Sequence, residues 1–200
     1  MGANFGDLDN DGYLDFYLGT GYTGYHALMP NLMYLNREGK SFADVTTAGG
    51  FGHLQKGHGV AFADIDNDGD QDVFEQLGGA LGGDKFMDSL YENPGFGNHW
   101  VRISIAGVDS NRSAIGARIR IVTSEGDRRR TIYKHVNSGG SFGANPLQQT
   151  VGLGKAERIE LLEIYWPKTD RTQTFTEVPM DASILIVETK QTLQVLDPGS

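Results

Sequence analysis

Short apolar runs, separated by glycine and aspartate, dominate the hydrophobic pattern of this chain. Those that predict strands in the first half are residues 16–18 (FYL), 40–46 (KSFADVT) and 59–65 (GVAFADI). Polar and apolar positions alternate in the second half, where the predicted strands are residues 100–105, 117–122, 158–166 and 183–187. A helical turn fits only within residues 25–35, and Pro30 interrupts it. The pattern therefore predicts an all-β protein.

An internal repeat lies within the first half. Residues 2–15 (GANFGDLDNDGYLD) match residues 59–72 (GVAFADIDNDGDQD) at an offset of 57, with eight of fourteen positions identical. The same offset aligns residues 33–36 (MYLN) with residues 90–93 (LYEN). Two separate matches at one offset indicate a tandem structural unit of about blade length, as in a β-propeller.

Two aspartate clusters, both fitting D-x-D-x-D-G-x-x-D, hold the most distinctive chemistry. The candidate ligands of the first are Asp7, Asp9, Asp11, the carbonyl of Tyr13 and Asp15. Those of the second are Asp64, Asp66, Asp68, the carbonyl of Asp70 and Asp72. Alternate carboxylates can surround one Ca²⁺, which takes roughly six to eight oxygen ligands, while the glycine permits a sharp turn. We therefore expect two calcium ions, one in each loop.

Three alternatives to calcium-binding loops between strands fit the sequence less well. A solvated Asp/Gly turn would account for one copy more easily than for two copies at one offset. Mg²⁺ fits less well, because it demands octahedral geometry at shorter distances. An EF-hand would use Glu75 at position 12 of the second loop, but the first loop has Leu18 there and neither loop has helical flanks. We expect strand, loop and strand, with Asp72 as the closing ligand and Glu75 as a minor candidate.

The surroundings of the loops resemble the FG-GAP/VCBS repeat. After the first loop come a Tyr-x-Asn and a G-x-x-F-x-D-V-T pattern, formed by Gly39, Phe42, Asp44, Val45 and Thr46. The resemblance implies blades of an integrin-type β-propeller with calcium in each inter-strand loop. Such propellers close with about seven blades, whereas this chain has two units. We expect missing N-terminal blades, which the start at Met1 just before a motif favours, or edges covered by the second half or by self-association.

The second half resembles the ASPIC/UnbV domain. The residues that carry the resemblance are Gly107, Ser110-Asn111-Arg112, Ile115-Gly116-Ala117-Arg118, Ser138-Gly139-Gly140-Ser141-Phe142, Val151-Gly152-Leu153-Gly154 and Tyr165-Trp166-Pro167. The combination is similar to the cartilage acidic protein family, which has many bacterial members. It implies a β-sandwich-like domain and a calcium-binding protein used in adhesion or recognition. The expected organisation is two calcium-binding repeats in residues 1–97, an ASPIC/UnbV domain in 98–188 and a tail in 189–200.

The charge distribution supports the same division. Residues 1–97 carry 15 acidic and 4 basic residues, a net charge of −11, whereas residues 98–200 carry 11 acidic and 13 basic residues, a net charge of +2. The total of −9 argues against a nucleic-acid partner. The absence of cysteine excludes disulfides and thiolate metal sites. No apolar run approaches the roughly 20 residues of a membrane span, and no signal-peptide pattern is present. We expect a secreted or cell-surface protein whose signal lies outside this chain.

Several short motifs match those of enzymes, but the flanking structure or further ligands that each motif needs are not predicted here. Residues 139–143 match G-x-S-x-G, but no helix is predicted after them, so a glycine loop is expected. Residues 19–24 match G-x-G-x-x-G beside four carboxylates, which would repel a phosphate. His53 and His58 have no third ligand nearby for zinc. We therefore predict a binding protein and not an enzyme, with calcium and an unknown extracellular protein or glycan as partners.

Two further functional classes remain as alternatives. A hydrolase acting on glycans would need a pair of carboxylates outside the loops, and the pattern places no constraint on Asp84 and Asp88. A structural unit would assemble through open propeller edges. The run at residues 128–130 (RRR) is either a solvated hairpin end or a site for acidic glycans. Trp100, Tyr165 and Trp166 are expected to fill the sandwich core.

Overall fold

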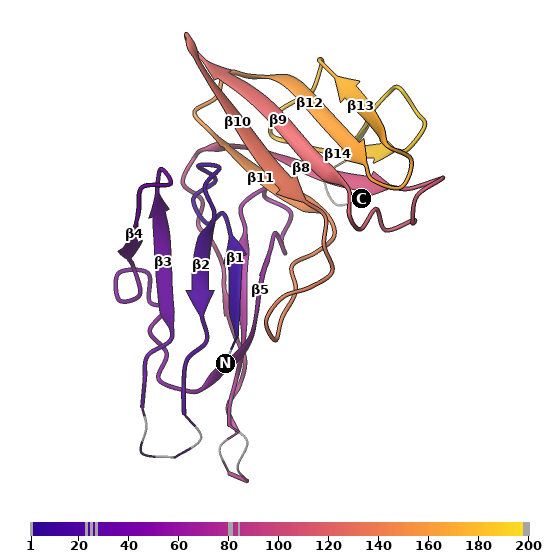
Figure 1. Ribbon diagram of the computed structural model, residues 1–200. Coiled ribbons are helices and arrows are strands. Elements are labelled where there is room, and N and C mark those ends of the chain that lie inside the picture. Colours follow the sequence, from indigo (N-terminus) through magenta and orange to yellow (C-terminus); the bar gives the residue numbers. More distant parts are fainter. Residues whose placement is uncertain are drawn as a thin grey trace.

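In the part of the chain that the structure describes, β-strands joined by loops form the fold (Figure 1). The computed structural model describes residues 2–22, 24, 26, 28–79, 82–83 and 85–197. Within them there is no helix, and the strands form four sheets. The all-β prediction is therefore confirmed, and every predicted strand coincides with an observed one. Of the stretch considered for a helical turn, Tyr25 and Ala27 lie outside the described residues, and the part from Leu32 onward is a strand.

The first half forms two blade-like sheets. The first blade contains β1 (Ala3–Gly6), β2 (Asp15–Leu18), β3 (Leu32–Arg37) and β4 (Ser41–Asp44), in the order β1-β2-β3-β4. The second blade contains β5 (Gly57–Ala63), β6 (Asp72–Leu77) and β7 (Ser89–Tyr91), in the order β5-β6-β7. All neighbours in the two sheets are antiparallel, which gives the meander expected of propeller blades.

The two blades share one hydrophobic core, because alternate residues of each strand point toward the other blade. Its buried members are Leu8, Tyr17, Met33, Leu35, Phe51, Val60, Phe62 and Val73. Strands β1 and β5, the first of each blade, lie side by side (Figure 1). Full burial of one large apolar side chain contributes about 1.5–3 kcal/mol, so this core holds the two blades together.

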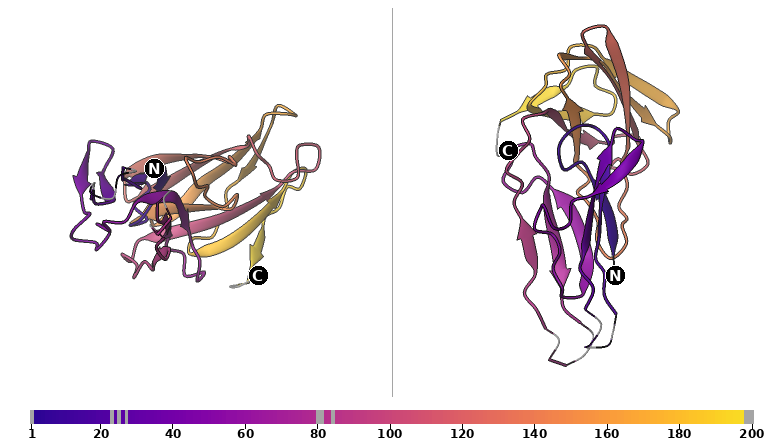
Figure 2. Two further views of the ribbon diagram at one scale, coloured as in Figure 1. Left: turned by 90° about the horizontal axis from the view of Figure 1, so that it is seen from below. Right: turned by 90° about the vertical axis from the view of Figure 1, so that its left-hand side faces the viewer.

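The second half forms two further sheets at one end of the blade pair (Figure 2). The first contains β10 (Arg128–His135), β9 (Arg118–Glu125), β12 (Arg158–Trp166) and β13 (Arg171–Phe175), in that order. The second contains β11 (Gln149–Gly154), β8 (His99–Ala106), β14 (Ala182–Val187) and β15 (Gln194–Leu196). Strands β8 and β14 are parallel, and the other pairs are antiparallel. Strand β15 lies within the segment predicted as a tail.

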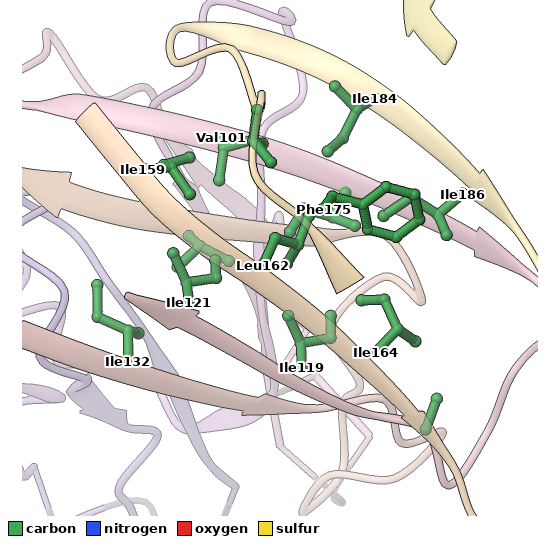
Figure 3. Packing of buried hydrophobic residues seen from close by; sticks show 14 of the residues in the cluster. Val101, Ile119, Ile121, Ile132, Ile159, Leu162, Ile164, Phe175, Ile184 and Ile186 are labelled. Atoms are coloured by element: carbon green, nitrogen blue, oxygen red, sulfur yellow. The ribbon is translucent and has the colours of Figure 1, made fainter. Parts of the chain in front are cut away.

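These two sheets enclose a core of their own. Ile119, Ile121 and Leu162 from one sheet meet Val101 and Ile184 from the other (Figure 3). This is sheet-on-sheet packing, in which the inner faces supply alternate apolar residues. The second half is therefore the β-sandwich-like domain that the sequence predicted.

The three aromatic residues expected in this core differ in their burial. Trp166 is buried there, and its indole N–H donates to Gln173 Oε1. The prediction was wrong for Trp100 and Tyr165, which are only partly buried. The Tyr165 hydroxyl donates to Asp170 at 3.1 Å. Trp100 lies against Gly69 of the second aspartate loop, so its apolar surface is used at the boundary between the halves.

Candidate metal centre

The two aspartate loops have the same backbone structure. In the first, the Gly12 N–H donates to Asp7 Oδ2 at 3.0 Å, and in the second the Gly69 N–H donates to Asp64 Oδ2 at 3.1 Å. Both glycines have positive φ angles, of 87° and 98°. A side chain at such angles is strained, so glycine is required at this turn. The repeat found in the sequence is thus a repeat of hydrogen bonds as well.

The last aspartate of each loop holds the loop closed. Asp15 accepts from the Leu8 N–H through Oδ2 and from the Asn36 N–H through Oδ1, both at 2.7 Å. Asp72 accepts the two equivalent backbone bonds at 2.9 Å. One donor in each case is the asparagine of the Tyr-x-Asn motif, which explains why this motif recurs with the loops. The carboxylates of Asp15 and Asp72 therefore organise the backbone before any ion is considered.

The structure brings three carboxylates of each loop together. Oxygen atoms of Asp7, Asp9 and Asp15 lie within 4.8 Å of one another, as do those of Asp64, Asp66 and Asp68. The two groups share their first two positions and differ in the third. Asp11 of the first loop and Asp72 of the second are predicted ligands that lie outside these groups of carboxylates. The carbonyls of Tyr13 and Asp70 stay predictions.

Burial raises the pKa values of carboxyl groups in the first cluster. Desolvation is the largest cause that raises the pKa of Asp7 to about 7, and the neighbouring carboxylates of Asp11 and Asp9 raise it further. Desolvation likewise raises the pKa of Asp15 to about 8. Lys134 acts in the opposite direction on Asp7, since a nearby ammonium stabilises the ionised carboxylate. Such a site favours either protons or a bound cation at neutral pH.

Three buried oxygen atoms at the loops have no hydrogen-bond partner among the described residues. They are Asp7 Oδ1, Asn10 Oδ1 and Asp64 Oδ1. A buried polar atom without a partner costs about 1–3 kcal/mol. All three are acceptors, so a cation or its water would satisfy them. The donor set is that of a hard-cation site, because it consists of carboxylate and amide oxygens.

Strand β11 of the second half covers the first loop. The Gly152 N–H donates to Asp7 Oδ2 at 3.2 Å, and the Gly154 N–H donates to the Asn10 carbonyl at 2.8 Å. A Cβ atom on Gly152 would come within 2.4 Å of both Asp7 Oδ2 and the Asn10 carbonyl carbon. The backbone approach is therefore close enough to require glycine at this position.

Arg130 of strand β10 also contacts the first loop. It donates to the Asp11 carbonyl, and its guanidinium lies 5.2 Å from the centroid of the Tyr13 ring. The arginines of residues 128–130 therefore do not share one role. Arg129 forms an exposed ion pair with Glu160 at 2.8 Å, whereas Arg130 packs at the boundary between the halves. The prediction of a solvated hairpin end was wrong for Arg130.

The second loop is contacted by Arg102 of strand β8. Its Nη1 donates to Asp64 Oδ2 and to Asn67 Oδ1, both at 2.7 Å, and its Nε donates to Ser183 at 2.8 Å. The second half thus supplies a buried cation to the second cluster. Sequence reasoning missed Arg102, although a signal existed: it shares one face of the strand with Trp100 and Ser104, whereas the apolar Val101 and Ile103 lie on the other.

Comparison with known families identifies both halves. Residues 7–75 match the FG-GAP-like repeat, and residues 107–193 match the family described as ASPIC and UnbV. An FG-GAP-like repeat region in residues 7–75 is therefore followed by an ASPIC/UnbV domain in residues 107–193. No curated protein matches it significantly. Each family covers less than half of the chain, so the identification rests on the two matches together.

The aspartate loops of the FG-GAP repeats lie between strands, not between helices. Strands β5 and β6 flank the second loop, which excludes an EF-hand. Glu75 lies on β6 with no exposed surface, where its Oε2 accepts from the Tyr17 hydroxyl at 2.7 Å. It belongs to the core between the blades and not to the acidic group of the second loop.

The G-x-S-x-G segment of the ASPIC/UnbV domain is a loop, as expected, and it runs along the two blades. Beside it, Asn145 joins the first strands of both blades. Its Nδ2 donates to the Phe5 carbonyl at 2.6 Å, while its Oδ1 accepts from the Phe62 N–H at 2.8 Å. The domain therefore covers the edges of β1 and β5, one of the outcomes expected for a chain with two blades.

The remaining candidate residues are scattered. His53 accepts from the Gln55 N–H at 3.2 Å and contacts the ring of Phe86, so it has a packing role. His58 lies close to the Gly78 carbonyl. Asp84 falls outside the described residues, and Asp88 accepts from the Leu77 N–H at 3.1 Å. In the part of the chain that is described, no helix is long and apolar enough to cross a membrane.

Proposed function

We propose that this chain is an extracytoplasmic calcium-binding protein used for adhesion or recognition of a protein or glycan. The observation that carries the proposal is the repeated loop, in which a buried aspartate has an Oδ1 atom without a hydrogen-bond partner among the described residues. Two such loops, with matching backbone bonds, lie where the FG-GAP repeats meet the ASPIC/UnbV domain. Calcium would then fix the orientation of the blades relative to that domain.

The proposed ligands are the residues of the two motifs. Those of the first ion are Asp7, Asp9, Asp11, the carbonyl of Tyr13 and Asp15. Those of the second are Asp64, Asp66, Asp68, the carbonyl of Asp70 and Asp72. The ion would supply positive charge where burial disfavours ionised carboxylates. Extracellular calcium modules bind at about 10⁻⁴–10⁻³ M, so we expect an affinity in this range for an extracytoplasmic protein.

A cleft between the halves supports recognition of a glycan. It has a volume of about 820 Å³ and lies between strand β1 and the segment that follows β10. Phe5 and Tyr133 offer aromatic surface in it, and Asn137 and Gln149 offer amide groups. Such a mixture suits a ligand with both apolar faces and hydroxyl groups. Among the described residues that line it, the one acid is Asp64, which is paired with Arg102 and so does not favour hydrolysis.

The metal proposal is tested by counting ions. Calcium titration of the chelated chain, followed by native mass spectrometry, should show two bound ions for the wild type. Asp9→Ala and Asp66→Ala should each remove one ion, whereas Asp127→Ala, in an exposed hairpin turn, should remove none. Calcium at 100 times its dissociation constant adds about 2.7 kcal/mol per site to the free energy of unfolding. Excess chelator should therefore lower the melting temperature by several degrees.

The recognition proposal needs a separate measurement. An array of glycans and matrix proteins should be probed with the full chain in calcium and in chelator. We expect binding that depends on calcium and is weakened by Tyr133→Ala in the cleft. A chain that binds no metal and melts at the same temperature in chelator would contradict the metal proposal, whereas calcium binding without any captured glycan or protein would contradict only the recognition proposal.

A further inference from the structure

The cleft between the halves differs in charge from the chain as a whole. The chain has a net charge of −9, yet Asp64 is the one acid among the described residues that line the cleft, and it is paired with Arg102 at 2.7 Å. The basic residues of the lining are Arg118, Lys134 and His135. Lys134 interacts with carboxylates of the first aspartate loop. Arg118 and His135 therefore remain for a ligand, and an arginine beside a second N–H donor favours a negatively charged one.

Strand register places Arg118 and His135 side by side. The two residues are direct partners across β9 and β10, so their Cβ atoms are about 4.5–5.5 Å apart. Both side chains are exposed. They point away from the sandwich core, because the next residue after Arg118, Ile119, is buried in that core. The pair lies on the outer face of its sheet, where the edge strand β10 borders the cleft (Figure 1).

Arg118 differs from the next arginine of β9 in its partners. Arg120 is paired with Glu163 at 2.6 Å. Arg118 has no carboxylate partner among the described residues, and its guanidinium lies 5.7 Å from the centroid of the Tyr165 ring. A ring contact helps to orient a guanidinium but does not occupy its N–H donors, which match the oxygens of an acidic group bidentately. The donors of Arg118 are therefore oriented and available.

An exposed aromatic ring lies beside this pair. Tyr133 is two residues before His135 on β10, so its side chain stands on the same face of the sheet, about 7 Å along the strand. The ring is 70% exposed and also lines the cleft. One ligand can therefore lie with an apolar surface against Tyr133 and reach Arg118 with an acidic substituent.

We propose that the ligand of this cleft is an anionic glycan, whose carboxylate or sulfate group is bound by Arg118 and His135 while a sugar ring packs against Tyr133. This inference rests on the recognition proposal and narrows it to acidic sugars. The aromatic and amide groups of the lining favour a glycan over an acidic peptide, because they suit alternating apolar faces and hydroxyl groups. The acidic remainder of the chain repels such a ligand, so its binding is confined to the cleft.

The first test compares tetrasaccharides of one sugar backbone that differ in their acidic group. Calorimetric titration of the full chain in calcium would use oligogalacturonate, which carries carboxylates, sulfated oligogalactan, and the neutral oligogalactan. At least one acidic form should bind about tenfold or more tightly than the neutral form, and added salt should weaken it. The comparison of the two acidic forms distinguishes carboxylate from sulfate. A polyglutamate peptide is the fourth probe and should bind no better than the neutral sugar.

The second test removes the proposed charge. Arg118→Gln keeps hydrogen-bonding capacity and should abolish the preference for the acidic sugar while leaving the affinity for the neutral one unchanged. Arg118→Lys should retain part of the preference, because it keeps the charge but loses the bidentate fork. Arg128→Gln is the matched control, since it removes an exposed arginine of β10 that does not line the cleft. Melting curves of each variant check that it is folded.

The outcomes separate this inference from the recognition proposal. Equal binding of acidic and neutral sugars would overturn the anionic ligand and leave glycan recognition standing, whereas binding of no sugar would overturn both. Acidic sugars that bind Arg118→Gln as tightly as the wild type would also overturn the inference, because the acidic group would then lie elsewhere, such as at a bound ion. So would equal losses for Arg118→Gln and Arg128→Gln, or a polyglutamate peptide that binds as well as the acidic sugars.

Discussion

Arg102 of the ASPIC/UnbV domain donates from Nη1 to Asp64 Oδ2 of the second FG-GAP loop at 2.7 Å. The side chains are only 4% and 2% exposed, so this is a buried ion pair between the halves. Burial raises the pKa of Asp64, and the guanidinium counteracts that rise. The ASPIC/UnbV domain thus neutralises part of the charge of the cluster, and calcium would neutralise the remainder.

Removal of this arginine should destabilise the folded chain. Arg102→Met keeps much of the side-chain length but leaves Asp64 buried without its partner, which costs about 3–5 kcal/mol. The loss should be measured by urea unfolding in chelator and should shrink in calcium, which would replace the missing positive charge. Arg120→Met is the matched control, because its pair with Glu163 is partly exposed and is worth about 1 kcal/mol or less. Equal losses for the two variants would show that Arg102 has no special role.

Gly152 should be sensitive to one added methyl group. Gly152→Ala places a Cβ within 2.4 Å of the Asn10 carbonyl carbon, so strand β11 must move away from the first loop. We expect a loss of about 1–3 kcal/mol in the free energy of unfolding and weaker calcium binding at the first loop. Gly139→Ala is the control, since nothing lies within 4 Å of its added Cβ. Calorimetric titration and melting curves that are the same for both variants would contradict the close approach.

The two halves should differ when they are expressed separately. Residues 98–200 enclose a core between two complete sheets, so we expect a dispersed amide NMR spectrum with or without calcium. Residues 1–97 lose Arg102, Arg130 and the strand that covers the first loop, so they should be unfolded or aggregated in chelator. A dispersed spectrum of residues 1–97 in chelator would contradict this division of roles. Failure of both segments would instead indicate one cooperative unit.

Glu75 should make the stability of the chain depend on pH. Burial raises its pKa from 4.5 to about 7, and the hydrogen bond from Tyr17 counteracts only part of that rise. The folded chain therefore retains a proton that the unfolded chain releases between about pH 4.5 and pH 7. Stability from this group falls as pH rises through that window, by about 2–3 kcal/mol in total.

Glu75→Gln isolates this effect, because an amide can still accept the hydrogen bond from Tyr17. In saturating calcium, urea unfolding should show the variant gaining stability relative to the wild type between pH 5 and pH 8. Glu92→Gln changes an exposed side chain and should show no such gain. If the free energies of unfolding of Glu75→Gln and the wild type differed by the same amount across this range, the pKa of Glu75 would not be raised by burial.

The local structure of the loops follows from the amino-acid sequence. The D-x-D-x-D-G-x-x-D spacing, with asparagine and glycine at the turn, dictates which backbone N–H groups reach Asp7 and Asp15, and these bonds span few residues. Alternation of polar and apolar residues likewise predicted strands β8, β9, β12 and β14 of the sandwich, but not β10, β11, β13 and β15. The strand at β3 was not foreseen, because Pro30 and the glycines before it mask a short six-residue strand.

The surroundings of the loops, and the faces of the blades that are covered, depend on the tertiary structure. Arg102 and Asp64 are 38 residues apart in the chain, and no local pattern specifies that they meet. Phe5 and Phe62 occupy equivalent positions of one repeat, yet only Phe62 is buried. The sequence assigns both to an apolar face, but burial requires a neighbour, and only the arrangement of the sheets in space supplies or withholds one.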